Sequence, residues 1–139
     1  MKKPLIYILG FVLFFAGMIW WSKSLQSKDP DVIARSGLHW HPTLAIYVNG
    51  EKQEVPPNIG ITGGAMMPMH THEPDGTVHV ESAGVVRKDD ITLGKFFKIW
   101  GKDINSFGTN VKMTVNGKEN AEYENYAMQD KDQIELRFD

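Results

Sequence analysis

The first two dozen residues are almost entirely apolar, whereas polar and apolar positions alternate along the rest of the chain. Lys2 and Lys3 precede a run of seventeen uncharged residues that ends in Trp20 and Trp21. A helix of this length rises roughly 26 Å, close to the thickness of a bilayer core. Lysines favour the cytoplasmic side, and tryptophans favour the opposite interface. The pattern predicts a single-pass transmembrane anchor over residues 1–21, with a cytoplasmic N-terminus.

A cleaved secretory signal shares the positive start and the apolar core of this segment. However, the run ends in two tryptophans, and no small-x-small cleavage site follows it. Under either interpretation the remaining chain lies outside the cytoplasm, and the uncleaved anchor would hold it at the cell membrane. Residues 22–37 are polar, mixed in charge and interrupted by Pro30, which is typical of a linker. We therefore expect an extracytoplasmic domain over residues 38–139.

Short strand patterns separated by strong turn signals dominate this domain. Asn-Gly or Pro-Asp-Gly sequences mark three turns between β-forming segments. The predicted strand pairs are 43–48 with 52–55, 69–71 with 77–82, and 111–115 with 133–138, and residues 123–128 are predicted to add an edge strand. The domain is thus expected to contain mainly antiparallel β-structure.

One helix interrupts the strands. Thr92 is a suitable N-cap, Phe96, Phe97 and Trp100 recur at helical spacing, and Gly101 suits a C-cap. Strands, one short helix and further strands indicate an α+β class. The last thirty or so residues are also similar to the closing strands of β-grasp folds, a likeness based on common strand–turn chemistry.

The amino-acid composition limits the kinds of binding site that this chain can form. A formal net charge of −2 gives no basic surface for nucleic acid. The chain has no cysteine, which excludes disulfides, iron–sulfur clusters and thiolate zinc sites. Any metal site must therefore use imidazole, carboxylate or thioether ligands.

Five histidines lie within the middle third of the chain. They occur as His39-Trp-His41, as His70-Thr-His72, and as His79 two residues before Glu81. Residues i and i+2 of a strand point to the same face, so each stretch presents two potential ligands together. Neutral imidazole is the commonest protein metal ligand. The spacing predicts that these six side chains converge on a metal ion.

Copper is the first choice for this ion and zinc the second. Nitrogen-rich sites without thiolate suit several metals, and the general affinity order favours copper. Met66, Met67 and Met69 directly precede His70, and thioether is a soft ligand that suits Cu(I). We include Met69 among the predicted ligands. The alternative is that these methionines fill gaps in the core.

Several of these motifs resemble those of a family of small bacterial and archaeal proteins with an N-terminal anchor. The resemblance covers roughly residues 38–102, and its motifs are His39-Trp-His41, Met69-His-Thr-His72, Gly76-Thr-Val-His-Val-Glu81 and Thr92-Leu-Gly-Lys-Phe-Phe-Lys-Ile-Trp-Gly101. It implies that the histidines belong to the family pattern, and it implies no particular activity.

The sequence thus predicts a non-enzymatic, membrane-anchored metal-binding protein for metal handover, storage or protection. One alternative is a small metalloenzyme in which Glu81 or Glu73 serves as base, but the chain has no His-Glu-x-x-His helix. The other is an accessory module of a membrane complex whose histidines bind no metal. The sequence does not identify a protein partner.

Overall fold

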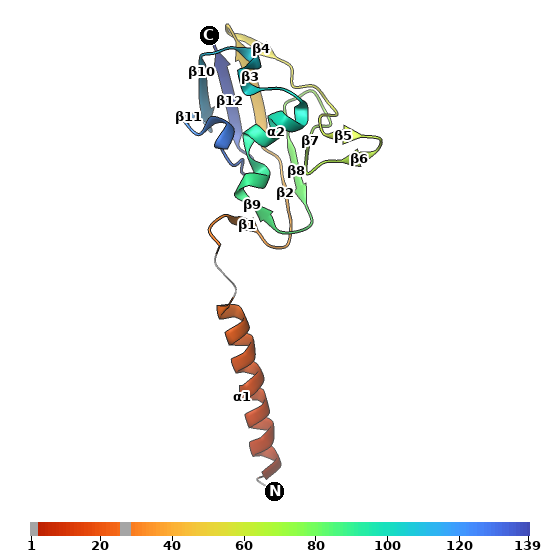
Figure 1. The fold of residues 1–139 in the computed structure, drawn as a ribbon, viewed down its shortest axis with the longest axis vertical. Coiled ribbons are helices and arrows are strands. Elements are labelled where there is room, and N and C mark those ends of the chain that lie inside the picture. The colour runs from red at the N-terminus through yellow and green to blue at the C-terminus, as the bar shows by residue number, and fades with distance from the viewer. Residues whose placement is uncertain (1–2, 26–28) are drawn as a thin grey trace. The chain divides into compact units, whose positions relative to one another are not determined.

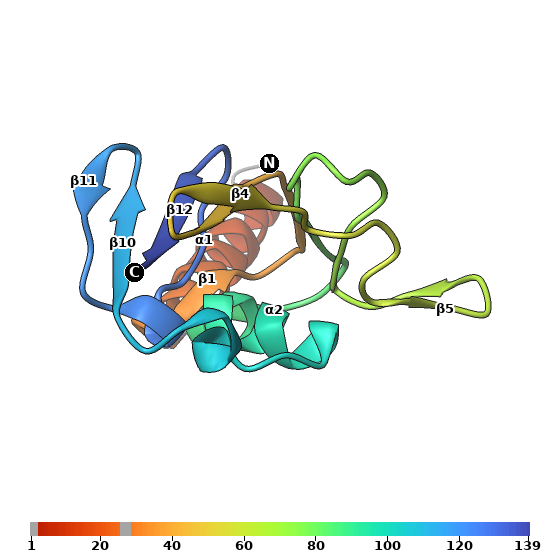
Figure 2. The same ribbon diagram turned by 90° about the horizontal axis from the view of Figure 1, so that it is seen from above.

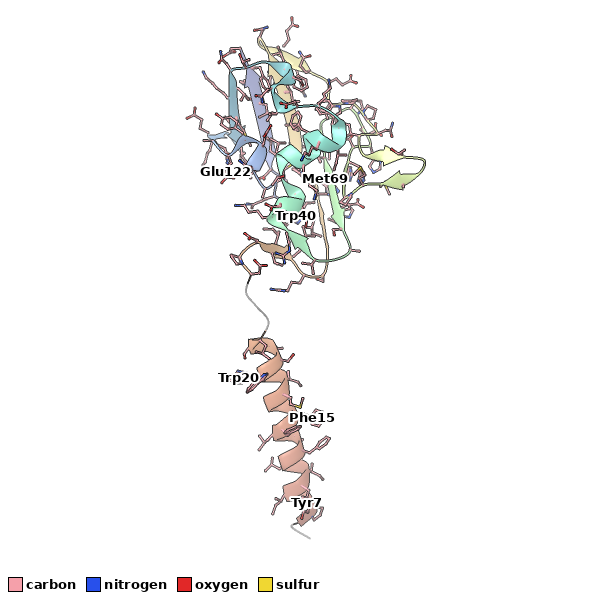
Figure 3. All side chains as sticks on the ribbon, in the orientation of Figure 1. Tyr7, Phe15, Trp20, Trp40, Met69 and Glu122 are labelled. Atoms are coloured by element: carbon pink, nitrogen blue, oxygen red, sulfur yellow. The ribbon has the colours of Figure 1, made fainter. Side chains whose placement is uncertain are left out.

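The computed structural model describes residues 3–25 and 29–139, which fall into two compact units divided after Pro30. The first unit is helix α1, Lys3–Ser24. Residues Ile6–Ser24 are long and apolar enough to cross a membrane, and none of this stretch is buried by other parts of the protein. Figure 3 shows apolar side chains such as Phe15 and Trp20 along the helix. A signal sequence would pass the same test of length and composition.

The second unit, Asp31–Asp139, is built on a five-stranded sheet with strand order β11-β10-β12-β3-β4 (Figure 1). These strands are β3 (Thr43–Val48), β4 (Glu51–Gln53), β10 (Val111–Val115), β11 (Lys118–Glu119) and β12 (Gln133–Phe138). Neighbours pair antiparallel except for β12 and β3, which run parallel, with Leu136 opposite Ile46. The predicted α+β class with a mainly antiparallel sheet is confirmed.

Two Asn-Gly turns set the register of the outer hairpins. Asn49 and Gly50 have φ of 50° and 82°, and Asn116 and Gly117 have φ of 53° and 76°. Positive φ at both central residues is the requirement of a type I′ turn, which Asn-Gly meets with little strain. Both turns therefore form where the sequence predicted them, and the predicted pairing of 111–115 with 133–138 is confirmed. The strand β11 that follows the second turn was not predicted.

Helix α2, Leu93–Trp100, covers one face of the sheet (Figures 1 and 2). Thr92 caps its start by accepting a hydrogen bond from the Lys95 N–H, and Gly101 ends it in the left-handed conformation. Its apolar face buries Leu93, Phe96 and Phe97 in the same core as the inward-facing residues of β3 and β12. The predicted helix and both of its caps are confirmed.

A second, three-stranded sheet has the order β2-β8-β7. It consists of β2 (Leu38–Trp40), β8 (His79–Ser82) and β7 (Met69–His70). Two short ladders complete the β-structure: β1 (Val32–Ala34) pairs with β9 (Val86–Arg87), and β5 (Ile61–Thr62) pairs with β6 (Ala65–Met66). Figure 2 shows β5 and its hairpin projecting from the domain.

The compact unit begins earlier than the expected domain boundary. We expected a linker as far as Gly37, but β1 lies within that segment and pairs with β9 through Val32 opposite Arg87. The Gly37 N–H also donates to the Gly84 carbonyl at 2.8 Å. Residues 31–37 thus have backbone partners that their polar composition did not indicate.

The predicted edge strand over residues 123–128 is wrong. Tyr123–Asn125 form a 3₁₀ helix, one of three, the others being Lys88–Ile91 and Ile104–Phe107 within the described residues. The following backbone pairs with the start of α2: the Leu93 N–H donates to the Tyr126 carbonyl at 2.9 Å. The segment therefore forms its backbone hydrogen bonds with the residues around the helix N-terminus rather than with the edge of the sheet.

A buried carboxylate fixes the start of β12. Asp132, 5% exposed, accepts hydrogen bonds from the Tyr126 hydroxyl at 2.6 Å, the Gln129 N–H at 2.8 Å and the Asn116 side-chain amide at 2.9 Å. Burial, followed by the bond to Asp132, raises the pKa of Tyr126 well above its usual value, so the phenol remains a donor. Asp132 thus connects the Asn116 turn and the loop from Tyr126 to Gln129 to the start of the central strand β12.

Asp132→Ala is expected to lower the free energy of unfolding by about 3 kcal/mol, because three donors lose their buried acceptor. Urea unfolding followed by circular dichroism measures this. Asp89→Ala, at an exposed position, is the control and should change stability by less than about 0.5 kcal/mol. Equal effects of the two substitutions would contradict the structural role of Asp132.

Candidate metal centre

The five histidines come from three segments that meet in the β2-β8-β7 sheet. The register places His39 opposite Glu81 and His70 opposite His79, while His41 and His72 lie just beyond the ends of β2 and β7. Strand β8 lies in the middle of this sheet. His79 is therefore flanked by one histidine pair on each side.

The imidazole rings lie within a few ångströms of one another. Ring centroids are 4.6 Å apart for His39 and His41, and 4.8 Å apart for His70 and His72. The ring of His79 is close to all four of these, at 4.7 Å from His72, 4.8 Å from His41, 5.4 Å from His70 and 6.4 Å from His39. His79 is thus the centre of the cluster.

Two sets of three ligand atoms are close enough to hold an ion. One set is His39, His41 and His79, and the other is His70, His72 and His79; within each set the atoms lie within 4.8 Å of one another. Ligands bound to one zinc or copper ion lie about 2.0–2.1 Å from it, so their mutual distances are at most about 4.1 Å. The separations within each set thus exceed that limit by less than about 1 Å.

The two ring nitrogens of His70 lie in very different surroundings. The side chain is fully buried, and its Nδ1 lies 2.9 Å from the Met67 carbonyl oxygen. A carbonyl only accepts, so Nδ1 carries the proton and donates, which leaves Nε2 with a lone pair. Nε2 is buried and has no hydrogen-bond partner. A carbonyl on one ring nitrogen and a free lone pair on the other is the arrangement typical of metal-bound histidine.

Glu81 contacts two of the histidines. Its Oε1 lies 2.9 Å from His39 Nε2 and 3.9 Å from His79 Nδ1. The shorter contact is a hydrogen bond in which His39 Nε2–H donates, which orients that ring and leaves its Nδ1 for a ligand. In this arrangement Glu81 is positioned to orient His39 rather than to bind the ion directly.

The pKa of His79 is lowered from its usual value. Burial is the largest cause, and the neighbouring imidazoles of His41, His72 and His70 act in the same direction, while Glu81 opposes them. A lowered pKa keeps the ring neutral over a wider pH range. Only neutral imidazole has a lone pair to offer, so the cluster favours the ligand form of its central residue.

The three methionines have different surroundings. Met69 is fully buried in the hydrophobic core, and because successive residues of a strand face opposite ways, it points away from the side that His70 occupies. We therefore exclude it from the ligand set. Met66 and Met67 are 57% and 48% exposed, and they line a groove together with His39, His70 and Glu81.

Two residues that the sequence did not single out hold the ligand segments in place. Thr71 is fully buried; its hydroxyl donates to the Pro56 carbonyl at 2.8 Å and accepts from the Ile59 N–H at 3.0 Å. The carboxylate of Asp130 accepts from the His41 N–H at 3.0 Å. The position of Thr71 between two histidines signals that it faces the opposite side, whereas nothing local indicates Asp130.

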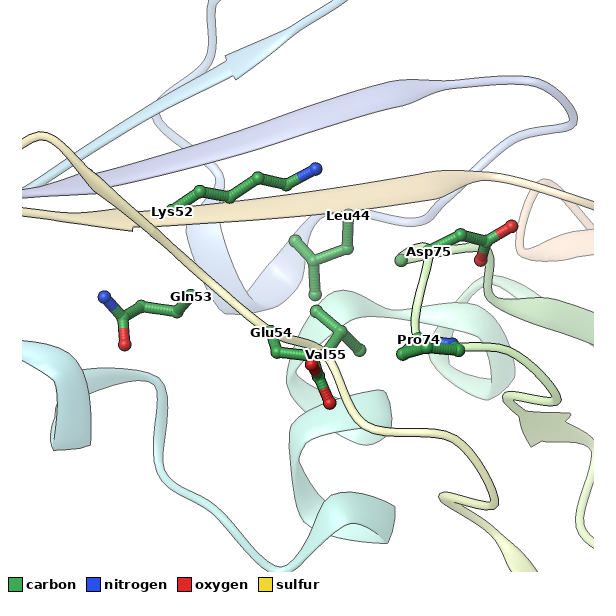
Figure 4. Close-up of a pocket in the computed structure, with 8 residues that line it drawn as sticks. Leu44, Lys52, Gln53, Glu54, Val55, Pro74 and Asp75 are labelled. Atoms are coloured by element: carbon green, nitrogen blue, oxygen red, sulfur yellow. The ribbon is translucent and has the colours of Figure 1, made fainter.

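The turn between His72 and His79 packs directly on the main sheet. Gly76 has φ of 87°, and its carbonyl accepts from the Leu44 N–H at 2.8 Å. A Cβ atom at this position would lie 2.3 Å from the Leu44 carbonyl oxygen. Figure 4 shows the neighbouring Asp75 and Pro74 beside Leu44. This close approach fixes the hairpin formed by β7 and β8 against β3.

Comparison with models of protein families, with curated proteins and with solved structures gave no match to this chain. The functional inference therefore depends on the residues and their geometry.

Gly76→Ala is expected to destabilise the domain by at least about 2 kcal/mol more than Gly50→Ala. Both glycines have nearly the same positive φ, 87° and 82°, but a Cβ at Gly50 meets nothing within 4 Å. The difference thus isolates the backbone clash from conformational strain. Thermal or urea unfolding of the two variants measures it, and equal stabilities would show that the turn is free to move.

The metal-free protein is expected to lose stability as the pH falls through about 6.5. Because the pKa of His79 is lowered in the folded state, the unfolded chain takes up that proton first, and acid favours unfolding. Urea midpoints at about pH 7.5 and about pH 5.5, with a chelator present, measure the loss. His79→Asn should show a smaller decrease than the wild type. An identical pH dependence in both proteins would refute the assignment of this stability loss to His79.

Proposed function

We propose that this protein is a membrane-anchored, non-enzymatic metal-binding protein whose histidine cluster holds copper, or failing that zinc. The ligands are drawn from His39, His41, His70, His72 and His79, with Glu81 as an orienting residue. The observation that carries the proposal is the buried Nε2 of His70, whose lone pair has no partner. An unpaired buried polar atom costs about 1–3 kcal/mol, which a bound ion removes.

Copper is favoured by the donors around the cluster. Imidazole suits both Cu(II) and zinc, and the affinity order places Cu(II) above zinc. The thioethers of Met66 and Met67 line the same groove as His39 and His70, and soft sulfur favours Cu(I) in particular. These two thioethers do not increase the expected affinity for zinc, so we rank zinc second.

Handover is the role that the exposure of the cluster supports best. Structural zinc sites are closed, with four protein ligands that exclude water. Here the side chain of His39 is 60% exposed, and His41 and His72 are also exposed. An ion on such a surface remains accessible to the ligands of another molecule. Storage and protection use the same chemistry and differ only in what removes the ion.

The anchor and its orientation belong to the same proposal. The length and apolar composition of Ile6–Ser24 support a single membrane span. Two lysines before this span and two tryptophans near its end support a cytoplasmic N-terminus and a C-terminal domain outside the cytoplasm. A copper-binding domain is useful there, because free copper ions enter from outside.

We also infer that the domain is β-grasp-like, as its last strands suggested. The support is the sheet order, in which the parallel pair β3–β12 is flanked by β4 on one side and β10 on the other. Helix α2 lies between these two halves in the sequence and packs into the same core.

His70→Asn is expected to lower the affinity of the full-length protein for Cu(II) at least about tenfold, because the buried ligand is lost. His72→Asn, at an exposed position, should also weaken binding but leave the fold intact. Isothermal titration in detergent, after removal of metal by a chelator, measures both. Glu73→Gln, an exposed neighbour outside the cluster, is the control and should bind as the wild type does. Absence of stoichiometric binding by the wild type would refute the proposal.

A further inference from the structure

The two histidine triads share one member, His79, and differ in one respect: the inner-strand member His70 is fully buried, whereas His39 and His41 are both exposed. We infer that the cluster is a two-position relay: an outer position formed by His39, His41 and His79, and an inner position formed by His70, His72 and His79. One ion occupies either position and passes between them without leaving the domain. This inference rests on the proposed metal binding and adds a direction of movement to it.

Because both triads include His79, a bound ion occupies only one of the two positions at a time. A neutral imidazole has one nitrogen lone pair, because the other nitrogen carries the proton. His79 therefore serves one ion at a time. Within the described part of the chain, His79 is also the residue whose ring lies near both pairs, whereas His39 is grouped with His41 and His70 with His72.

The outer position is suited to capture. The side chains of His39 and Glu81 are 60% and 38% exposed, so an arriving ion reaches them from solvent or from a partner's ligands. The carboxylate of Glu81 adds negative charge beside this triad and attracts a cation. Its hydrogen bond to His39 also fixes the ring before the ion arrives.

The inner position is suited to retention. His70 is fully buried, and its Nε2 is the unpaired atom that an ion would satisfy. The Met67 carbonyl holds the opposite nitrogen of the same ring at 2.9 Å, so this ligand is oriented in advance. Outer and inner residues also line one groove of about 600 Å³, which contains His39, Glu81 and His70.

Movement between the positions is a ligand exchange with no redox step. The ion stays bound to His79 while its bonds to His39 and His41 break and bonds to His70 and His72 form. The numbers of imidazole ligands and the charge of the ion are unchanged. The ion is therefore never without protein ligands during the transfer.

Electron paramagnetic resonance of the full-length protein in detergent, loaded with less than one equivalent of Cu(II), tests the relay. The wild type should show two nitrogen-coordinated copper species. His39→Asn/His41→Asn should retain only the inner species, and His70→Asn/His72→Asn only the outer one. His79→Asn should weaken both. Glu73→Gln, with both triads intact, should match the wild type.

Three results would overturn the relay. A single copper species that disappears in both double variants would indicate one site made of all five histidines. Two ions bound together by the wild type, when Cu(II) is then added in excess, would show that His79 does not make the positions exclusive. No copper bound by the wild type would refute the proposed function as well, so the two failures are distinguishable.

Discussion

The candidate site depends on one buried imidazole that is held by its backbone neighbours. His70 is fully buried with Nδ1 bound to the Met67 carbonyl and Nε2 unpaired. A buried polar atom without a partner lowers the stability of the fold, because the same atom is hydrogen-bonded to water in the unfolded chain. The next residue, Thr71, ties this segment to two other backbone segments through its hydroxyl. The orientation of the unpaired nitrogen is therefore built into the fold, and it is this feature on which the proposed metal binding depends.

The elements that could be predicted from the sequence are those that local chemistry determines. Asn49-Gly50 and Asn116-Gly117 form turns because Asn and Gly accept positive φ at both positions. Helix α2 begins at a Thr that accepts from the Lys95 N–H and ends at a left-handed Gly. The pairing of histidines also follows from strand periodicity, since each His-x-His places two rings on one face. Each of these features is decided within about five residues of the chain.

The features that the sequence did not predict depend on contacts between distant residues. Residues 123–128 have the composition of a strand, but their backbone bonds to the start of α2, some thirty residues earlier. Met69 is adjacent to a ligand and chemically suitable, yet the alternation of β7 directs it into the core. The central position of His79 follows from the order β2-β8-β7, which strand propensity does not reveal.

Metal ligation and folding favour the same protonation state in this cluster. Four imidazoles surround that of His79; protonated imidazoles repel one another, and burial opposes charge on the central ring. The folded domain therefore favours a neutral His79 ring, and a neutral ring has the lone pair that a metal ion needs. Rigidity comes from residues that have no part in ligation: Gly76 against Leu44, Thr71 against Pro56, and Asp132 at the start of β12. These contacts hold the backbone around the cluster, so the fold itself brings the three histidine segments together.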